Sequence, residues 1–363
     1  QNATDVVDDV MDIDNTITNI NSGVVADGNW YLHIRTVDNV NNWSSVSSFG
    51  PYMVDTVAPV TTVSGIDADW HNTPVTVTFT CTDTDGSGCF KTFYSINGGT
   101  FVEGNSVEIS TEGYNQVDFY SVDNAGNSEV TVVYPQTVNI DVTSPVNPSE
   151  FVSDPDINIS TQDNTVWITW ISGMVPAGTV SPMITSGAYD NLSGVKQFQY
   201  KFSMIELDSV NEFDPTTTAY DVTSEPLTDG VWYFHMRTED NANNFSDTTS
   251  YGPFIIDNTK PVITRNGTDV TITQGQTYTD AGATAFDTQD GNITASIVTV
   301  NPVNTNVLGV YTVTYNVTDS AGNIADQVTR TVTVVAAPVI PAVAGVDDEQ
   351  EVVDQEENNN EEE

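Results

Sequence analysis

Apolar and β-branched residues alternate with polar ones along most of the chain, in short runs that end at turn-forming residues. Val75–Thr80 alternates in this way, and Phe93–Ile96 leads into Asn97, Gly98 and Gly99, a typical hairpin signal. No stretch shows an apolar stripe at the 3.6-residue period of a helix. Short strands, frequent turns and no helical periodicity predict an all-β chain of antiparallel sandwiches.

One strand-and-turn segment occurs four times. The clearest copy is Trp232–Asn244, and Trp30–Asn42 nearly repeats it. Looser copies occupy Val117–Asn127 and Tyr311–Asn323. Each copy runs from aromatic and β-branched residues into Asp, Asn and a small residue, the chemistry of a strand followed by a turn. We interpret each copy as one module, so the chain is predicted to be a tandem array.

A second repeated pattern, Asp-x-x-x-Pro, predicts the boundaries between modules. It occurs at Asp55–Pro59, Asp141–Pro145 and Asp257–Pro261. Proline lacks an amide donor and has a fixed φ, so it ends a strand and stiffens the connection to the next one. We call these three segments the joints. The predicted modules are residues 1–58, 59–144, 145–260 and 261–335, followed by an acidic tail at 336–363 that is expected to be disordered.

The first module is shorter than its counterpart. Phe49–Asp55 aligns with Tyr251–Asp257, yet the residues before Trp30 are too few for the early strands that precede Trp232. Two explanations are open: the chain is a fragment of a longer protein, or another chain supplies the strands. We favour the fragment.

Composition narrows the choice of partners. The chain has 8 Lys and Arg against 51 Asp and Glu, a net charge of −43. Nucleic acids and anionic membranes attract basic surfaces, so neither is expected as a partner, whereas cations are. Solubility in a salty medium is the other explanation of the charge. No apolar run is long enough for a membrane span, and Gln1–Asn15 shows no signal peptide.

The two cysteines, Cys81 and Cys89, are predicted to form a disulfide. The loop between them is short and rich in Asp and Gly, and no further Cys or nearby His would complete a zinc site. A disulfide implies an oxidising compartment, and so short a loop constrains the unfolded chain only modestly.

Aspartate and asparagine side chains in the repeated turns are candidate calcium ligands, because Ca²⁺ takes six to eight oxygens. The candidates in these turns are Asp38, Asn39 and Asn42, Asp123, Asn124 and Asn127, and Asp240, Asn241 and Asn244. We expect each set to lie near the joint that comes after it. The fourth turn, at 319–323, precedes only the tail and is expected to bind most weakly. The other explanation is that these residues only build turns.

Two further acidic clusters have calcium-like spacing, but neither completes a twelve-residue loop with a closing Glu. Their candidate ligands are Asp83 and Asp85 between the cysteines, with a counterpart at Asp190, and Asp287 and Asp290 in the last module. Turn formation is again the simpler explanation of each.

Nothing in the sequence predicts catalysis. Small sandwiches offer no cleft for paired carboxylates, no Gly-x-Ser-x-Gly motif occurs, and His33 and His235 occupy the same place in two copies of one strand. The tryptophans are expected to be mainly structural, with Trp30 and Trp232 in cores because both begin equivalent strands.

The modules resemble known families. The third, with Val166–Trp170 and Trp232–Thr238, is similar to bacterial fibronectin type III domains, and the first resembles the end of another. The second, with the loop Asp83–Cys89, resembles bacterial immunoglobulin-like modules. The fourth, with Tyr278–Ala285, is similar to immunoglobulin-like and cadherin-like domains of bacterial surface proteins. The resemblance implies an extracellular or cell-surface setting and, from cadherin-like arrays, calcium at the joints.

We therefore expect a non-enzymatic extracellular structural or adhesive rod, with Ca²⁺ as its cofactor and a surface glycan or protein as its target. One alternative is a filament subunit that self-associates into fibres by strand exchange at the incomplete first module; an exposed hydrophobic groove there would favour it. The other is a spacer or carbohydrate-binding region of a secreted hydrolase, which an exposed row of aromatic residues would favour.

Overall fold

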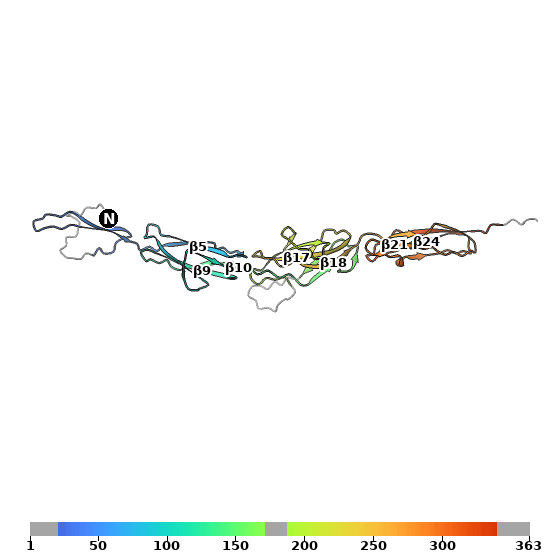
Figure 1. The fold of residues 1–363 in the computed structure, drawn as a ribbon, viewed down its shortest axis with the longest axis horizontal. Helices are drawn as coiled ribbons and strands as arrows, with labels where there is room; N and C mark the ends of the chain where they lie inside the picture. Colours follow the sequence, from blue (N-terminus) through green and yellow to red (C-terminus); the bar gives the residue numbers. More distant parts are fainter. Residues whose placement is uncertain (1–20, 171–186, 340–363) are drawn as a thin grey trace, which may run out of the picture. The chain divides into compact units, whose positions relative to one another are not determined.

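The computed structural model describes residues 21–170 and 187–339. Within them the chain is β-structure, with a single short 3₁₀ helix, η1 (Thr294–Ser296). The predicted all-β class is confirmed. The predicted disordered tail lies mostly outside the described residues. The chain divides into two compact units, the second comprising residues from 256 onward together with 160–164 and 228–230. Each is described by itself (Figure 1).

The first module is one antiparallel hairpin among the described residues, β1 (Gly28–Ile34) with β2 (Ser47–Val54). Its register places Trp30 opposite Tyr52 and Leu32 opposite Phe49. Several of its apolar side chains are exposed, including 39% of Leu32 and 56% of Tyr52. No second sheet covers this two-stranded hairpin among the described residues, so the exposure of its apolar side chains is expected.

Two sheets form the second module. One sheet orders β3 (Val60–Ser64), β5 (Val75–Thr82) and β8 (Ser106–Ile109). The other orders β4 (Trp70–His71), β10 (Val132–Ile140), β9 (Gly113–Asp123), β6 (Cys89–Ile96) and β7 (Val102–Glu103). The alternating residues of β5 and β9 bury Val77, Phe79, Val117 and Phe119 in a shared core.

The third module has the same plan with a larger aromatic core. One sheet orders β11 (Phe151–Asp154), β13 (Trp167–Trp170) and β16 (Asp221–Thr223). The other contains β18 (Thr249–Ile256), β17 (Gly230–Asp240), β14 (Val195–Ser203) and β15 (Thr216–Thr217). Trp170 of the first sheet lies 5.9 Å from Phe234 and 5.2 Å from Phe198 of the second, between ring centroids. Aromatic packing across the sandwich therefore joins its two sheets.

The last module lies in the second compact unit, as does the short strand β12 (Ser160–Thr161). One sheet orders β19 (Val262–Arg265), β21 (Ala283–Asp287) and β22 (Gly291–Asn292). The other orders β20 (Val270–Thr273), β25 (Val328–Val335), β24 (Gly309–Asn316) and β23 (Val298–Val300). β20 pairs with β25 in parallel here, as β4 does with β10 in the second module.

Local sequence signals correspond closely to the observed elements. Asn97 and Gly98 both have positive φ, 52° and 68°, as a tight turn between β6 and its neighbour requires. The predicted disulfide between Cys81 and Cys89 is confirmed. The expectation of cores around Trp30 and Trp232 is wrong: both are half-buried, and only Trp170 is buried among the six tryptophans, all of them described. The boundaries drawn between modules stay a prediction.

Candidate cation sites

The four repeated turns share one backbone geometry. The amide of the first Asp donates to the carbonyl of the Asn four residues later, at 3.0 Å for Asp38 and 3.1 Å for Asp123, Asp240 and Asp319. The Asn amide in turn donates to the Asp Oδ1, at 2.7 to 2.8 Å. In all four, the Asp side chain therefore stabilises the turn, and each turn has a carboxylate at its start that a cation could also bind.

Three of these turns bring their Asp into an acidic triad. Each triad combines the Asp of a joint, an Asp from an early loop of the next module and the first Asp of that module's turn. The triads are Asp55, Asp83 and Asp123; Asp141, Asp190 and Asp240; and Asp257, Asp287 and Asp319. Within each triad, one carboxylate oxygen from every residue lies within 4.8 Å of the others.

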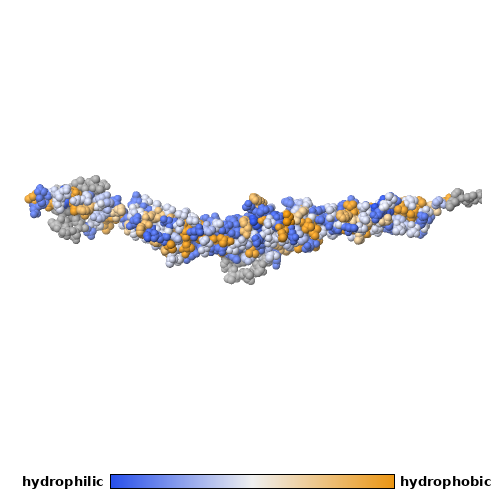
Figure 2. Space-filling model, viewed as in Figure 1, coloured by the Kyte–Doolittle hydropathy of each residue, from blue (hydrophilic) through white to orange (hydrophobic). Residues whose placement is uncertain are grey.

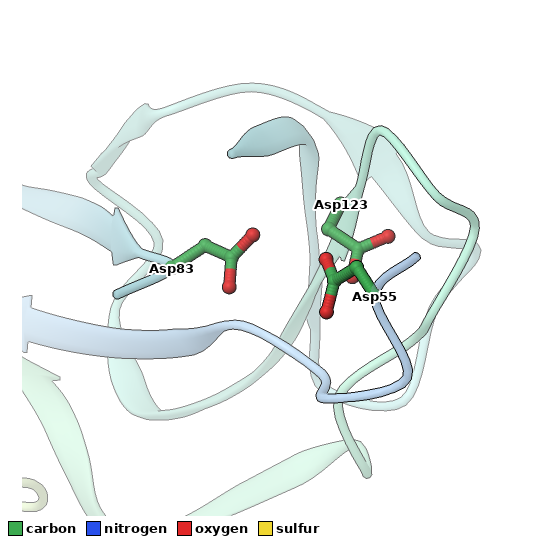
Figure 3. A group of neighbouring side chains, drawn as sticks. All are labelled: Asp55, Asp83 and Asp123. Atoms are coloured by element: carbon green, nitrogen blue, oxygen red, sulfur yellow. The ribbon is translucent and has the colours of Figure 1, made fainter. Parts of the chain in front are cut away.

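Three separate segments of the fold supply the first triad (Figure 3). Asp55 comes directly after β2, Asp83 comes after β5 in the disulfide loop, and Asp123 ends β9. Their carboxylates converge although the residues are far apart in sequence. An oxygen-only ligand set of this kind suits a hard cation such as Ca²⁺ or Mg²⁺.

An asparagine fixes each joint to the turn it meets. The Nδ2 of Asn127 donates to the carbonyl of Asp55 at 3.0 Å, that of Asn244 to Asp141 at 2.8 Å, and that of Asn323 to Asp257 at 2.9 Å. The same contact therefore recurs in all three triads. Because the Asn side chain holds the joint backbone, the joint Asp is positioned beside the turn Asp.

The predicted pairing of turns with joints is wrong by one joint. Asp123 meets the Asp55 joint that precedes its module, and Asp240 likewise meets Asp141. The order of the strands explains the correction. The strand that leads into each turn runs back to the end of the sandwich where the chain entered. The premise for a weak fourth turn is also wrong, because Asp319 lies beside Asp257.

The other predicted ligands lie outside the triads. The Nδ2 atoms of Asn124 and Asn241 donate to the carbonyls of Gly88 and Gly194, which shapes the loops that carry Asp83 and Asp190. Asp290 accepts hydrogen bonds from Ser320. Asp38, Asn39, Asn42 and Asp85 belong to no triad among the described residues; Asp85 is an exposed turn residue at φ 62°.

Sequence reasoning placed the joint aspartates at boundaries but did not name them as ligands. Asp55, Asp141 and Asp257 supply one carboxylate to each triad. The signal was present, because the Asp-x-x-x-Pro pattern keeps Asp at a fixed place when the residues between vary. Asp190, the predicted counterpart of Asp83, and Asp319, in the turn predicted to bind most weakly, both belong to triads.

Hydrogen bonding distinguishes the triads. Asp55 Oδ2 accepts from the Ser87 amide at 2.7 Å, and Asp141 Oδ2 accepts from the Ser193 amide at 3.0 Å. Ser87 contributes most to the low pKa of the Asp55 carboxyl. In the third triad, the Oδ2 atoms of Asp257, Asp287 and Asp319 are buried and accept no hydrogen bond within the described structure.

Burial changes the acidity of two triad members. Desolvation raises the pKa of Asp257, and the charges of Asp287, Asp319 and Asp229 raise it further against the Thr259 amide hydrogen bond. Desolvation also raises the pKa of Asp240, opposed by hydrogen bonds from Asn244. A bound cation would counter both effects, because an opposite charge favours the ionised carboxylate.

A cluster of aromatic rings lies on the outer face of the second module. Tyr94 and Phe119 pair across β6 and β9 and pack in the core, so Phe93 and Tyr120, the next pair along, face outward. Their rings stack at 5.2 Å, and Phe101 contacts Tyr120 edge-on at 5.0 Å. Such rings suit stacking on a sugar, which is the feature expected of the carbohydrate-binding alternative.

Residues 263–334 match the family model described as a bacterial surface protein, Ig-like domain. The match covers the last module and confirms its predicted resemblance to bacterial surface immunoglobulin-like modules. No curated protein matches the chain. Among the described residues, no helix is long and apolar enough to cross a membrane.

Several solved structures are similar in fold. The tetra-tandem repeat from the extending region of a large adhesion protein is 14% identical, with 88% of this chain and 85% of that chain covered and a TM-score of 0.24. The fibronectin(III)-like modules of Clostridium thermocellum CbhA are 12% identical, with 55% and 95% covered and a TM-score of 0.30. The sialic acid binding region of a Streptococcus sanguinis adhesin is 12% identical, with 78% and 79% covered and a TM-score of 0.22.

Proposed function

We propose that the chain is a non-enzymatic structural or adhesive part of a bacterial surface protein, and that Ca²⁺ bound by the aspartate triads fixes its joints. The family match of residues 263–334 supports the surface setting. The cores of the sandwiches are filled by aromatic and aliphatic side chains, which suits modules that serve as spacers or supports. On the face shown in Figure 2, hydrophobic residues are interspersed with hydrophilic ones.

The observation that carries the proposal is the recurrence of one constellation at three joints. Every triad supplies carboxylate oxygens alone, and every joint Asp is held by an Asn from the turn. Turn formation alone does not require three carboxylates within 4.8 Å of one another. Their like charges repel at this distance, so the arrangement is unfavourable without a counter-charge. A bound cation attracts all three carboxylates, and so it holds the joint Asp against the module that follows the joint.

Small-angle scattering of the whole chain, with Ca²⁺ and then with a chelator, tests the proposal. We expect calcium to narrow the range of distances within the molecule, because it orders the joints. Asp326→Asn is a matched control: its side chain is 94% exposed and lies outside the triads, so its response should equal that of the wild type. An unchanged scattering profile together with no calcium bound by calorimetry would contradict calcium at the joints.

A second candidate function, self-association through the first hairpin, is favoured by exposed apolar positions. Leu32 and Tyr52 are 39% and 56% exposed, whereas their counterparts Phe234 and Phe254 in the third module are fully buried. In the third module, a second sheet covers this face. A strand from a second copy of the chain would bury the corresponding face of the first hairpin, which is the arrangement of strand exchange.

Sedimentation velocity over a range of concentrations tests self-association. If copies associate through this face, Leu32→Asp should reduce the oligomer, because a charge on the buried face is costly. Leu207→Asp provides the control, since Leu207 is 86% exposed in the third module. A wild-type chain that stays monomeric at all concentrations would rule out this candidate.

A further inference from the structure

The third triad differs from the other two in a way that determines how it binds. We infer that Asp257, Asp287 and Asp319 form the tightest divalent-cation site of the chain, and that the ion it takes is Ca²⁺. The inference rests on the proposed function and reverses the order of affinity expected from sequence. Three observations support it: the burial of the three aspartates, their carboxylate oxygens that accept no hydrogen bond from the described protein, and the comparison with the two equivalent triads.

Burial is most complete at the third triad. Asp257 is 0% exposed, Asp287 1% and Asp319 9%. The Oδ2 atom of each lies beneath the surface without a hydrogen-bond donor from the described protein. A buried carboxylate oxygen without a partner is costly, and three of them close together are costlier because their charges repel. A divalent cation bound among the three carboxylates would offset both costs.

The remaining oxygens of the triad are already engaged. Asp257 Oδ1 accepts from the Thr259 amide at 3.1 Å, Asp287 Oδ1 from the Gln289 amide at 2.7 Å, and Asp319 Oδ1 from the Asn323 amide at 2.7 Å. These bonds fix the orientation of each carboxylate. The ligand atoms are therefore held in place before an ion arrives, which reduces the cost of ordering them.

In the first two triads, the Oδ2 atom of the turn Asp accepts a hydrogen bond from the protein. Asn127 Nδ2 donates to Asp123 Oδ2 and Asn244 Nδ2 to Asp240 Oδ2, both at 2.8 Å. Each of these asparagines also bonds the joint carbonyl. At the third joint, Asn323 Nδ2 bonds the carbonyl of Asp257, and Asp319 Oδ2 is left without a donor.

The early loop explains why the Oδ2 atom of the joint carboxylate in the third triad also lacks a donor from the described protein. In the second and third modules the loop that supplies the middle Asp also points a serine amide at the joint carboxylate, Ser87 to Asp55 and Ser193 to Asp141. In the last module the loop between β21 and β22 places Gln289 there instead, and its side chain donates to the carbonyl of Ile256 at 3.3 Å. Asp257 Oδ2 consequently has no protein donor within the described residues.

No basic side chain compensates the third triad within the described residues. Lys260, the nearest basic residue in sequence to Asp257, pairs with the exposed Asp326 at 3.2 Å. The buried Arg330 of the same module bonds Asp280 and backbone carbonyls. The charge of the three aspartates is therefore left for an ion from solution.

The oxygen chemistry favours Ca²⁺. Carboxylates are hard ligands, which excludes a preference for soft metals. Ca²⁺ bonds oxygens at about 2.3–2.6 Å, so ligands on opposite sides of it lie about 4.6–5.2 Å apart, whereas Mg²⁺ holds them nearer at about 4 Å. One oxygen from each aspartate lies within 4.8 Å of the others, a limit that both ions satisfy. Mg²⁺ usually keeps several waters and binds through one or two carboxylates, whereas three buried carboxylates match the larger number of protein oxygens that Ca²⁺ takes.

Titration calorimetry of the whole chain with Ca²⁺ alone, and with Mg²⁺ alone for comparison, tests the inference. We expect one site that binds more tightly than any other and prefers Ca²⁺. Asp287→Asn should weaken that site by at least about tenfold, since even groups that only support a ligand contribute 10–100-fold. Asp123→Asn and Asp240→Asn, the matched changes in the other triads, should leave it unchanged.

Thermal unfolding without calcium distinguishes loss of a ligand from loss of the fold. Asp287→Asn removes a buried, uncompensated charge, so the calcium-free last module should melt at the same or a higher temperature while its response to calcium disappears. Loss of the tight site in Asp123→Asn or Asp240→Asn, with its retention in Asp287→Asn, overturns the inference and leaves calcium at the joints standing. No saturable binding by the wild type overturns both.

Discussion

His235 shows how a single residue makes stability depend on pH. It is fully buried on β17, with Nδ1 2.8 Å from Ser250 Oγ and Nε2 3.1 Å from Ser203 Oγ. Burial lowers its pKa, and Lys201 adds to this effect against the opposing charge of Asp208. The folded chain therefore keeps His235 neutral at a pH where the unfolded chain protonates it.

We expect the third module to lose stability as pH falls below about 6.5, the pKa of an unfolded histidine. The unfolded state binds the extra proton in this range, so the slope is at most about 1.4 kcal/mol per pH unit. Calorimetric unfolding between pH 7.5 and 5.5 measures it. His235→Gln should flatten the slope of the third module, and His33→Gln, which changes a residue of the first module, should leave that slope unchanged. Equal slopes in all three chains would contradict this role for His235.

Asp280 is the centre of a buried polar network in the last module. It accepts hydrogen bonds from Tyr278 Oη at 2.9 Å, from Tyr315 Oη at 2.7 Å and from Arg330, whose side chain is 1% exposed. Burial and the Asp280 charge raise the pKa of Tyr315 to about 12. The carboxylate is thus the counter-charge that allows Arg330 to be buried.

Asp280→Asn should destabilise the last module by about 3–5 kcal/mol, because it leaves the Arg330 charge buried without a partner. Denaturant unfolding of the whole chain, followed by calorimetry to assign the transition, measures the change. The exposed pair of Lys260 and Asp326 supplies the comparison, since Asp326→Asn should cost no more than about 1 kcal/mol. Similar effects of the two substitutions would mean that Asp280 does not compensate Arg330.

At the scale of elements, two nearly identical hairpins differ in what covers them. Gly50 and Gly252 precede Pro51 and Pro253 at φ 135° and 147°, and an added Cβ would meet the facing carbonyl in each, at 2.8 and 3.1 Å. The backbones are therefore alike. The difference lies in the neighbours, because Phe234 packs against Trp170 of a second sheet and Leu32 has no such sheet among the described residues.

Truncating equivalent side chains in the two hairpins should have unequal effects. Phe234→Ala removes a fully buried ring and should cost about 3–5 kcal/mol in the unfolding free energy of the third module. Leu32→Ala, at a position 39% exposed, should cost about 1 kcal/mol or less. Urea unfolding of both variants measures the difference. A large loss from Leu32→Ala would indicate that a partner covers the first hairpin.

Local patterns predicted the elements well, and tertiary relations were harder to predict. Val75–Thr80 alternates and forms β5, and Asn97 with Gly98 forms the expected turn. Which joint a turn meets depends on the direction of the strand before it within the sandwich, which the turn sequence does not encode. Whether a carboxylate oxygen of a triad has a hydrogen-bond donor depends on residues in distant loops. The repeated turn sequence does not include those residues, so it makes the three sites look equivalent.

For the whole molecule, charge is the main determinant of how stability responds to salt. The 51 acidic residues outnumber the 8 basic ones, so folding brings like charges together across every module. Salt weakens this repulsion as the screening length falls from about 30 Å at 0.01 M to about 10 Å at 0.1 M. Monovalent salt alone should therefore stabilise the folded chain.

Raising NaCl from about 0.02 to 0.5 M should raise the melting temperatures of the modules, because screening shortens the reach of the repulsion. Differential scanning calorimetry in the presence of a chelator measures this effect without calcium. Adding CaCl₂ at constant ionic strength then separates ion binding from screening. Melting temperatures that stay constant or fall with NaCl would show that repulsion among the acidic residues does not limit stability.

The disulfide between Cys81 and Cys89 distinguishes the first joint from the other two. Asp83 lies inside this small covalent ring, whose cysteines are 8 positions apart, whereas Asp190 and Asp287 lie outside it. Disulfides form in oxidising compartments and not in a reducing cytoplasm. A reducing environment would leave the Asp83 loop open, so the position of this carboxylate depends on redox conditions, whereas the positions of Asp190 and Asp287 do not.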